Sequence, residues 1–191
     1  MLDPVFLRPI AHRGLHDAAA GVIENTAPAF EAALAKGYAI ECDLEAAAGG
    51  LPVVFHDDTL DRVTTETGPV ARLGAADLAR IRYRGSDTAG ILTFAEFLAL
   101  CGARVPLVVE IKSDWTPPDR AFLREIARLA AAHTGPIALM SFDPAVMAVL
   151  RELAPRVPRG IVSGRYRDAD GTPWWPQLGG WRSWKLANLI G

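Results

Sequence analysis

The sequence has little lysine and no excess of charge of either sign. Among its 191 residues lysine occurs only at Lys36, Lys112 and Lys185, and arginine supplies the other basic side chains. The formal net charge is −2 and the pI is about 6.1. A whole-protein field that attracts nucleic acid or an anionic membrane is therefore excluded. Because lysine is so scarce, a lysine beside an apolar strand, as Lys112 is, becomes a notable residue.

Cysteine is rare as well, and long apolar runs are missing. Two cysteines, Cys42 and Cys101, do not make a disulfide framework, so we expect buried free thiols in the apolar segments that hold them. No uncharged apolar stretch reaches about 18 residues, which argues against a membrane span. The first ten residues, MLDPVFLRPI, do not resemble a secretory signal. We therefore expect a cytoplasmic protein.

Half of the residues are hydrophobic, which permits a sizeable core and argues against disorder. Short runs rich in Val, Ile and Leu alternate with amphipathic stretches along the chain. This alternation predicts βα units and a parallel sheet. The predicted strands are 7–12, 38–43, 52–56, 106–111, 136–141 and 159–163.

Helix signals separate most of these strands. Capping residues predict helix starts at Thr26, Thr93 and Asp143, and the segment 119–133 has an apolar face. The segment 57–92 breaks the rhythm, because it is polar and glycine-rich with only one short helix candidate, near 75–82. We interpret it as an insertion at one end of the sheet.

Charged residues gather where four of the predicted strands end. Residues two apart in a strand face the same side, so Glu41 points with Asp43, and Glu110 points with Lys112. In an α/β barrel the carboxyl ends of the strands hold the active site. The four strand ends are Ala11-His12-Arg13-Gly14, Ile40-Glu41-Cys42-Asp43, Val54-Phe55-His56-Asp57 and Val109-Glu110-Ile111-Lys112.

This set of residue types predicts phosphodiester cleavage. Carboxylates that converge are tolerated when a divalent cation neutralises them, and oxygen ligands suit Mg²⁺ or Ca²⁺. Histidines indicate general acid–base catalysis, and an arginine and a lysine can bind a phosphate. The candidates are His12 and His56 as proton carriers, Arg13 and Lys112 as phosphate-binding cations, and Glu41, Asp43 and Glu110 as metal ligands.

Each candidate also has a structural interpretation. A charge at a strand end usually faces water, Glu110 and Lys112 could form a local ion pair, and either histidine could be a structural one. The alternating apolar residues Ile40 and Cys42 weaken the first interpretation for the second strand. Moreover, the structural interpretations would all have to apply at once, at the ends of four successive strands. A functional cluster explains the same residues with a single cause.

At this point the sequence resembles the glycerophosphodiester phosphodiesterase family. The resemblance implies a TIM-type (β/α) barrel with a small insertion after the third strand, which fits residues 57–92. The ordered set of matches is specific, although no single motif decides. The matching stretches are AHRG at 11–14, ENTAPAFEAALAKG at 24–37, ECDLE at 41–45, VVFHDDTLDRVTTETG at 54–68, LTFAEFL at 92–98, VPLVVEIK at 105–112 and SFDP at 141–144.

The resemblance also implies roles for individual residues. His12 and His56 would transfer protons, with His12 as base and His56 as acid. In the implied pathway a glycerol hydroxyl attacks phosphorus, the alcohol leaves, and water opens the cyclic phosphate to glycerol 3-phosphate. Glu24 and Asn25 match a turn that would orient the first loop. Arg13 and Lys112 would contact the phosphate, and Glu41, Asp43 and Glu110 would hold the divalent cation.

The sequence departs from the family at its end. An eight-stranded barrel typically takes about 250 residues, whereas we predict six strands within a single domain, 1–191, that lacks the last barrel elements. Open sheet edges favour aggregation. We therefore expect the chain alone to be unstable, aggregated or paired in a homo-oligomer, with little activity. The Trp-rich segment 174–184 could cover part of the gap.

Two other functions remain open at the level of sequence. Phospholipase D toxins and phosphatidylinositol-specific lyases share the layout and stop at a cyclic phosphate, but the missing signal peptide and disulfides argue against them. A non-catalytic remnant that binds a phosphodiester is favoured by the short C-terminus and opposed by the intact charged set. In each case we expect a small-molecule phosphodiester as the ligand.

Overall fold

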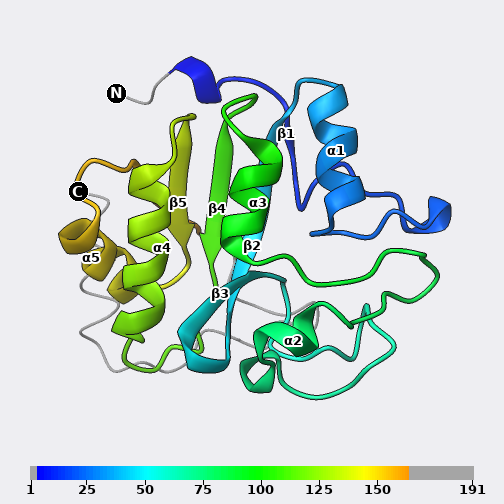
Figure 1. Ribbon diagram of the computed structural model, residues 1–191. Helices are drawn as coiled ribbons and strands as arrows, with labels where there is room; N and C mark the ends of the chain where they lie inside the picture. The colour runs from blue at the N-terminus through cyan, green and yellow to red at the C-terminus, as the bar shows by residue number, and fades with distance from the viewer. Residues whose placement is uncertain (1–3, 164–191) are drawn as a thin grey trace.

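A computed structural model describes residues 4–163 of the chain. Its sheet has the strand order β1-β2-β4-β5-β6, in which every neighbouring pair is parallel, and β3 pairs with β2 off this path. This arrangement confirms the predicted α/β fold with six strands in an open sheet (Figure 1). The strands are β1 (Ile10–Ala11), β2 (Ala39–Ala47), β3 (Leu51–Val54), β4 (Leu107–Ile111), β5 (Ile137–Ser141) and β6 (Arg159–Ile161).

The strand predicted at 52–56 is not the third parallel strand. β3 runs antiparallel to β2, with Leu44 opposite Val54 and Ala47 opposite Leu51, so the expectation of a parallel third strand is wrong. The physical reason is the short connection at 48–50, where Gly49 and Gly50 both have positive φ and reverse the chain. A parallel crossover needs a dozen or more residues. Only five of the described strands therefore follow the parallel path.

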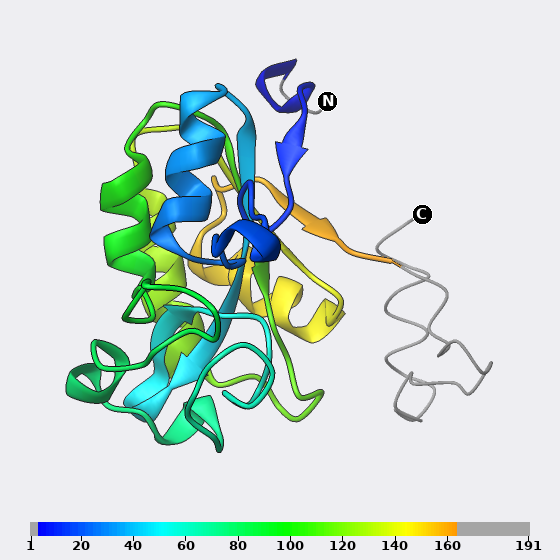
Figure 2. The ribbon, with the colours of Figure 1, turned by 90° about the vertical axis from the view of Figure 1, so that its right-hand side faces the viewer.

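Helices form where the capping residues predict them. Thr26 precedes α1, and the side chains of Thr93 and Asp143 accept hydrogen bonds from the first turns of α3 and α5. In both views α1, α3 and α4 lie on one side of the sheet (Figures 1 and 2), and α5 packs against α4 beside β5 and β6. The helices are α1 (Ala27–Ala35), α2 (Ala75–Leu78), α3 (Phe94–Cys101), α4 (Arg120–Ala132) and α5 (Pro144–Leu153), with 3-10 helices η1 (Pro4–Phe6), η2 (Ala18–Ala20), η3 (Ala48–Gly50) and η4 (Val70–Arg72).

The two faces of β2 have opposite chemistry. Ile40, Cys42 and Leu44 are fully buried in the hydrophobic core that the helices form with the sheet. Successive side chains in a strand point to opposite faces, so Glu41 and Asp43 project to the side away from the helices. Cys42 and Cys101 are buried free thiols, as predicted.

The segment 57–92 forms its own small core beside the hairpin. It contains η4 and α2, and a second hydrophobic cluster joins this segment to β3. Val53 and Phe55 of the hairpin pack there with Leu60, Leu78 and Tyr83. The insertion and the hairpin are thus one unit, and that unit sets the position of the chain at residue 56.

Within residues 4–163 the sheet does not close. β1 and β6 lie at its two ends, and each pairs with a single described strand. In the same part of the chain, no helix combines the length and apolar character that crossing a membrane requires. The Trp-rich segment 174–184 and the predicted break in the barrel fall outside the described residues.

The capping box of α3 gives a stability prediction. Thr93 Oγ1 accepts a hydrogen bond from Glu96 N, and the Glu96 carboxylate accepts one from Thr93 N. Thr93→Ala should lower the free energy of unfolding by about 0.5–2 kcal/mol, because the cap oxygen is lost. Urea unfolding measures this change. Thr93→Ser retains the oxygen and should lose less, and equal losses in the two variants would argue against the cap.

Candidate active site

Three carboxylates converge on the face of the sheet opposite the helices. Asp43 in β2 lies directly opposite Glu110 in β4. Glu41 lies two residues before Asp43, on the same face of β2. All three side chains are buried, with exposed fractions of 5% for Glu41, 1% for Asp43 and 8% for Glu110. One ligand oxygen from each lies within 4.8 Å of the others. The structure thus brings together all three predicted metal ligands.

Two cations lie against this carboxylate triad. Lys112 Nζ is 2.8 Å from Asp43 Oδ1 and 2.6 Å from Glu110 Oε1. Burial would lower the pKa of Lys112, but the two carboxylates raise it, so the side chain is an ammonium. Arg13 Nε lies 3.2 Å from Asp43 Oδ2. Both predicted phosphate-binding residues therefore point into the cluster.

Glu41 is the carboxylate that these cations leave uncompensated. Its Oε2 accepts a hydrogen bond from the backbone N–H of Arg13 at 2.9 Å, while its buried Oε1 has no hydrogen-bond partner in the described residues. Burial and the charge of Asp43 raise the pKa of Glu41 to about 7. An additional cation would compensate this charge. Oxygen separations up to 4.8 Å also suit a cation with bonds of about 2.0–2.6 Å, so the donor set fits a divalent metal.

The hairpin brings His56 to the same site. Since β3 runs back along β2, Phe55 N donates to Asp43 O, and His56 follows directly at the level of the triad. His56 Nδ1 lies 2.6 Å from Asp57 Oδ1. A carboxylate only accepts hydrogen bonds, so Nδ1 carries the proton and Nε2 is the ring atom that can exchange one with a ligand.

His12 reaches the triad from the end of β1. Its Nε2 lies 3.9 Å from Glu41 Oε2, and 68% of the side chain is exposed, against 30% for His56. Burial and the neighbouring Arg13 guanidinium lower the pKa of His12. The imidazole is therefore neutral at neutral pH and can accept a proton.

The turn after β1 depends on unusual backbone angles. Arg13 has φ +55°, a conformation that is uncommon outside glycine. Gly14 follows with φ +80°, and a Cβ on it would lie 2.8 Å from the Cβ of Ala29 in α1. Only glycine fits here, which explains why the histidine and arginine of the A-H-R-G motif are followed by one.

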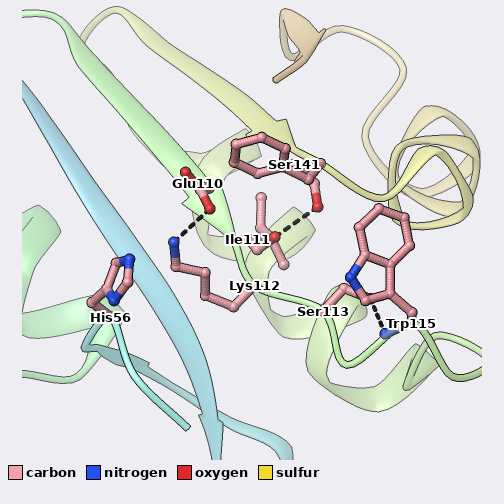
Figure 3. Close-up of a pocket in the computed structure, with 8 residues that line it drawn as sticks. His56, Glu110, Ile111, Lys112, Ser113, Trp115 and Ser141 are labelled. Carbon is pink, nitrogen blue, oxygen red and sulfur yellow. Dashed lines mark hydrogen bonds and ion pairs between the residues drawn. The ribbon is translucent and has the colours of Figure 1, made fainter. Parts of the chain in front are cut away.

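A pocket of about 290 Å³ opens beside Glu110 and Lys112. Figure 3 shows His56 on one side of this pocket and Trp115 on the other, with Lys112 pointing to Glu110 between them. His56 lines this pocket, whereas His12 is not among its lining residues. The pocket is lined by His56, Glu110, Ile111, Lys112, Ser113, Trp115, Ser141 and Phe142.

A family model settles what kind of protein carries this cluster. The model of the glycerophosphoryl diester phosphodiesterase family matches residues 12–178, which include all seven predicted site residues. The chain belongs to this family. The resemblance drawn from the motifs is thereby confirmed.

Individual relatives agree with the family match. A probable glycerophosphodiester phosphodiesterase 1 from Mycobacterium tuberculosis is 27% identical over 179 residues, covering 78% of this chain and 61% of the relative. Glycerophosphodiester phosphodiesterase 1 from Bos taurus is 48% identical over 66 residues, covering 34% of this chain and 19% of the relative. The chain thus spans about three fifths of the mycobacterial relative and a fifth of the bovine one.

Solved structures share the fold. A glycerophosphodiester phosphodiesterase from Agrobacterium tumefaciens superposes with a TM-score of 0.66 at 27% identity, covering 80% of this chain and 65% of that one. A phosphodiesterase from Oleispira antarctica, solved with the product sn-glycerol-3-phosphate, gives a TM-score of 0.70 at 24% identity, covering 85% and 68%. The open sheet described above therefore corresponds to part of a family barrel.

The structure adds a polar network that the sequence did not assign to the site. Glu24 Oε1 accepts hydrogen bonds from Arg13 at 2.8 Å and from Arg62 at 2.7 Å. Arg62 Nε also donates to Asp57 Oδ2 at 2.6 Å, and Asp57 in turn binds His56. The network therefore links the surroundings of both histidines, and Arg62 ties the insertion to the first loop.

Asn25 is the other unassigned residue. It is 1% exposed, donates to Asp43 Oδ2 at 2.9 Å, and accepts from the backbone N–H of Asp43 at 3.3 Å. Its φ is +56°, a conformation that asparagine tolerates better than most residues. The E-N-T motif at 24–26 was the available signal. That motif predicted a role in orienting the first loop. In the structure, Asn25 also contacts Asp43 of the triad directly.

The Arg62–Glu24 pair gives a pH prediction. Burial would raise the pKa of Glu24, but hydrogen bonds from Arg62 and Arg13 lower it to about 2 from an ordinary 4.5. A lowered pKa stabilises the fold above pH 4.5, and this stabilisation is lost as the pH falls through about 2. Arg62→Ala should therefore cost more stability at pH 6.5 than at pH 3.

Urea unfolding at the two pH values measures this difference. Arg62→Lys keeps the charge but not the planar fork, so it should show an intermediate loss. A loss from Arg62→Ala that is equal at both pH values would contradict an ion-pair origin.

Proposed function

We propose that the chain hydrolyses glycerophosphodiesters to glycerol 3-phosphate and an alcohol, with a divalent cation and two histidines. The observation that carries the proposal is the buried carboxylate triad, in which Glu41 Oε1 has no hydrogen-bond partner among the described residues. The family membership supports the same reaction. The substrate is a small molecule.

Glu41, Asp43 and Glu110 would hold the cation, either Mg²⁺ or Ca²⁺, because both prefer oxygen ligands. A bound cation would supply Lewis-acid stabilisation of negative charge on the phosphate oxygens. Arg13 and Lys112 would add positive charge on the same phosphate, and their contacts with Asp43 already place both side chains at the triad.

The two histidines transfer the protons in this proposed reaction. Neutral His12 takes the proton of the glycerol hydroxyl, whose oxygen forms a bond to phosphorus. The bond from phosphorus to the alcohol oxygen breaks, and His56, which starts the cycle as an imidazolium with protons on both nitrogens, gives that oxygen the proton on Nε2 and keeps the one on Nδ1. In the second half His56 takes a proton from water, the water oxygen bonds to phosphorus, and the ring oxygen leaves with the proton held by His12. Both histidines then return to their starting states.

Asp57 and Arg62 assist by holding His56 in place. The hydrogen bond from Nδ1 to Asp57 keeps Nε2 as the exchanging atom, and Arg62 orients the same carboxylate. Burial would raise the pKa of Asp57, but its bonds with Arg62 and His56 lower it, so Asp57 stays ionised during turnover.

The proposal is tested by measuring glycerol 3-phosphate released from glycerophosphocholine by the purified 191-residue chain. Release that requires Mg²⁺ or Ca²⁺ and stops with EDTA supports it. A cyclic phosphate as the final product would indicate a lyase instead. Binding of the substrate without any product would indicate a phosphodiester-binding remnant.

Size-exclusion chromatography of the same sample tests the predicted homo-oligomer. The cytoplasm stays the predicted compartment.

A further inference from the structure

The strand β2 changes its neighbour along one of its edges. Ala39 N donates to Pro9 O, which precedes β1, and the pairing with β1 ends at Ile40. Further along the same edge, Asp43 O accepts from Phe55 N, which follows β3. Asp43 therefore lies at the point where one neighbouring strand has ended and the chain that leaves the other has just arrived.

The side chain of Asn25 occupies this point. Its Oδ1 accepts from the backbone N–H of Asp43 at 3.3 Å, as the carbonyl of a neighbouring strand would. The carboxamide is planar, so its Nδ2 faces the Asp43 side chain, and it donates to Oδ2 at 2.9 Å. Asn25 is buried, which shields both bonds from water. One side chain thus holds the backbone and the carboxylate of Asp43 together.

Glu41, the other carboxylate of β2, is held in a similar manner. Its Oε2 accepts from the backbone N–H of Arg13 at 2.9 Å, and its Oε1 has no hydrogen-bond partner in the described residues. In Asp43 the held oxygen is Oδ2, while Oδ1 faces Lys112 Nζ at 2.8 Å. The segment between β1 and α1 therefore holds one oxygen of each carboxylate and leaves the other oxygen to the interior of the triad.

The backbone of Asn25 has a separate task. Its φ is +56°, and its N–H donates to Arg13 O at 2.9 Å, so it closes the turn against the first loop. Glycine would serve this backbone equally well, because it adopts positive φ at no steric cost. The turn alone therefore does not require a carboxamide, whereas the two bonds to Asp43 do.

We propose that Asn25 is a positioning residue that orients the Asp43 carboxylate toward the divalent cation. Carboxylates that bind a metal are commonly held by hydrogen bonds from residues around them. Without the carboxamide, Asp43 Oδ2 loses its donor at 2.9 Å, and the carboxylate can turn toward Arg13 or Lys112, which both lie within ion-pair distance. This inference rests on the proposed function and adds a residue to its metal site.

Asn25→Gly and Asn25→Ala test the assignment, because both remove the carboxamide but only glycine accepts the positive φ without strain. Asn25→Ala should therefore unfold at a lower urea concentration than Asn25→Gly. Calorimetric titration of the metal-free chain with Mg²⁺, and separately with Ca²⁺, measures the Kd at pH 8, above the raised pKa of Glu41 of about 7. Both variants should bind about 10- to 100-fold more weakly than wild type, and by the same factor, because the lost side chain is the same.

Thr93→Ala is the matched control. It weakens the fold through a helix cap at the start of α3, so its Kd should equal that of wild type. A wild-type Kd in both Asn25 variants, with lowered stability, would make Asn25 a turn residue only and would overturn the inference. Weaker binding in Asn25→Ala alone would overturn it too, since the defect would then follow the backbone.

Glycerol 3-phosphate release from glycerophosphocholine by wild type separates this inference from the proposed function. Weaker cation binding in both Asn25 variants, with no release by wild type, would support the inference and overturn the proposed hydrolysis. Cation-dependent release by wild type, with an unchanged Kd in both variants, would overturn the inference and leave the proposed function standing. A wild-type chain that binds neither cation would overturn both.

Discussion

His56→Ala should lower kcat for glycerophosphocholine by at least about 10²-fold, within the 10²–10⁴-fold range of general acid–base groups. Choline leaves as an alkoxide unless it receives a proton, and His56 Nε2 is the atom that the Asp57 hydrogen bond leaves available. The loss should appear in kcat more than in KM, because the proton moves in the transition state. His12→Ala should lose a comparable amount, since it removes the base.

A change of leaving group distinguishes the acid from the base. The p-nitrophenyl ester of glycerophosphate departs as a stable phenolate and needs no proton. His56→Ala should therefore recover much of its rate on this compound, whereas His12→Ala should not. The reverse pattern would exchange the two roles, and near-normal turnover of glycerophosphocholine by either variant would make that histidine structural.

Glu41→Gln should weaken binding of Mg²⁺ or Ca²⁺ by at least about 10- to 100-fold. Loss of an outer-shell partner alone costs that much at metal sites, and here a ligand with an uncompensated charge is neutralised without a change of shape. Isothermal titration measures the affinity. Glu125→Gln, which removes the same charge on the exposed side of α4, is the matched control and should bind close to wild type.

The same carboxylate predicts how the metal affinity depends on pH. The pKa of Glu41 is raised to about 7 in the metal-free protein, so a cation must displace a proton below that pH. Affinity should therefore rise as the pH passes through 7, and Glu41→Gln should flatten this rise. An affinity that is independent of pH from 6 to 8 in wild type would contradict the assignment of Glu41.

Stability of the metal-free protein should change in the opposite sense. The folded-state pKa of Glu41 lies above its ordinary 4.5, so its stabilising contribution is fully present below pH 4.5 and is lost as the pH rises through about 7. Added cation should offset this loss. Unfolding by urea at pH 5 and pH 8, with and without Mg²⁺, measures both effects, and a cation effect confined to pH 5 would contradict the triad as the binding site.

The triad could be predicted because alternation along a strand is a local property. Ile40 and Cys42 mark the core face, so Glu41 and Asp43 had to share the other one. The parallel register then sets Glu110 opposite Asp43, where E-x-D and E-x-K patterns on neighbouring strands would place it. Helix starts followed equally well from capping residues such as Thr93.

The antiparallel direction of β3 was not predicted, although the sequence contains two signals for it. Only eight residues separate Asp43 from Pro52, which is too few for a parallel crossover, and Gly49-Gly50 is a hairpin signal. His56 nevertheless lies beside the triad, because an antiparallel hairpin returns the chain to the level of Asp43. His56 therefore has the predicted position at the triad, but an antiparallel hairpin places it there and not a parallel strand.

The Arg62 network could not be predicted in the same way. Arg62 and Glu24 are 38 residues apart, and their pairing depends on how the insertion packs against the first loop. No local periodicity reports such a contact. The strain at Trp115 is equally invisible in sequence, since nothing in the S-D-W segment at 113–115 requires a positive φ.

Phosphorus NMR of glycerophosphocholine incubated with the 191-residue chain and Mg²⁺ or Ca²⁺ is the most direct test, because it separates substrate, cyclic phosphate and glycerol 3-phosphate in one time course. We predict that glycerol 3-phosphate accumulates slowly, because we expect the chain alone to have little activity, and that EDTA, Glu41→Gln and His56→Ala each suppress this release. Turnover that survives both EDTA and Glu41→Gln would contradict a metal-dependent site at the triad.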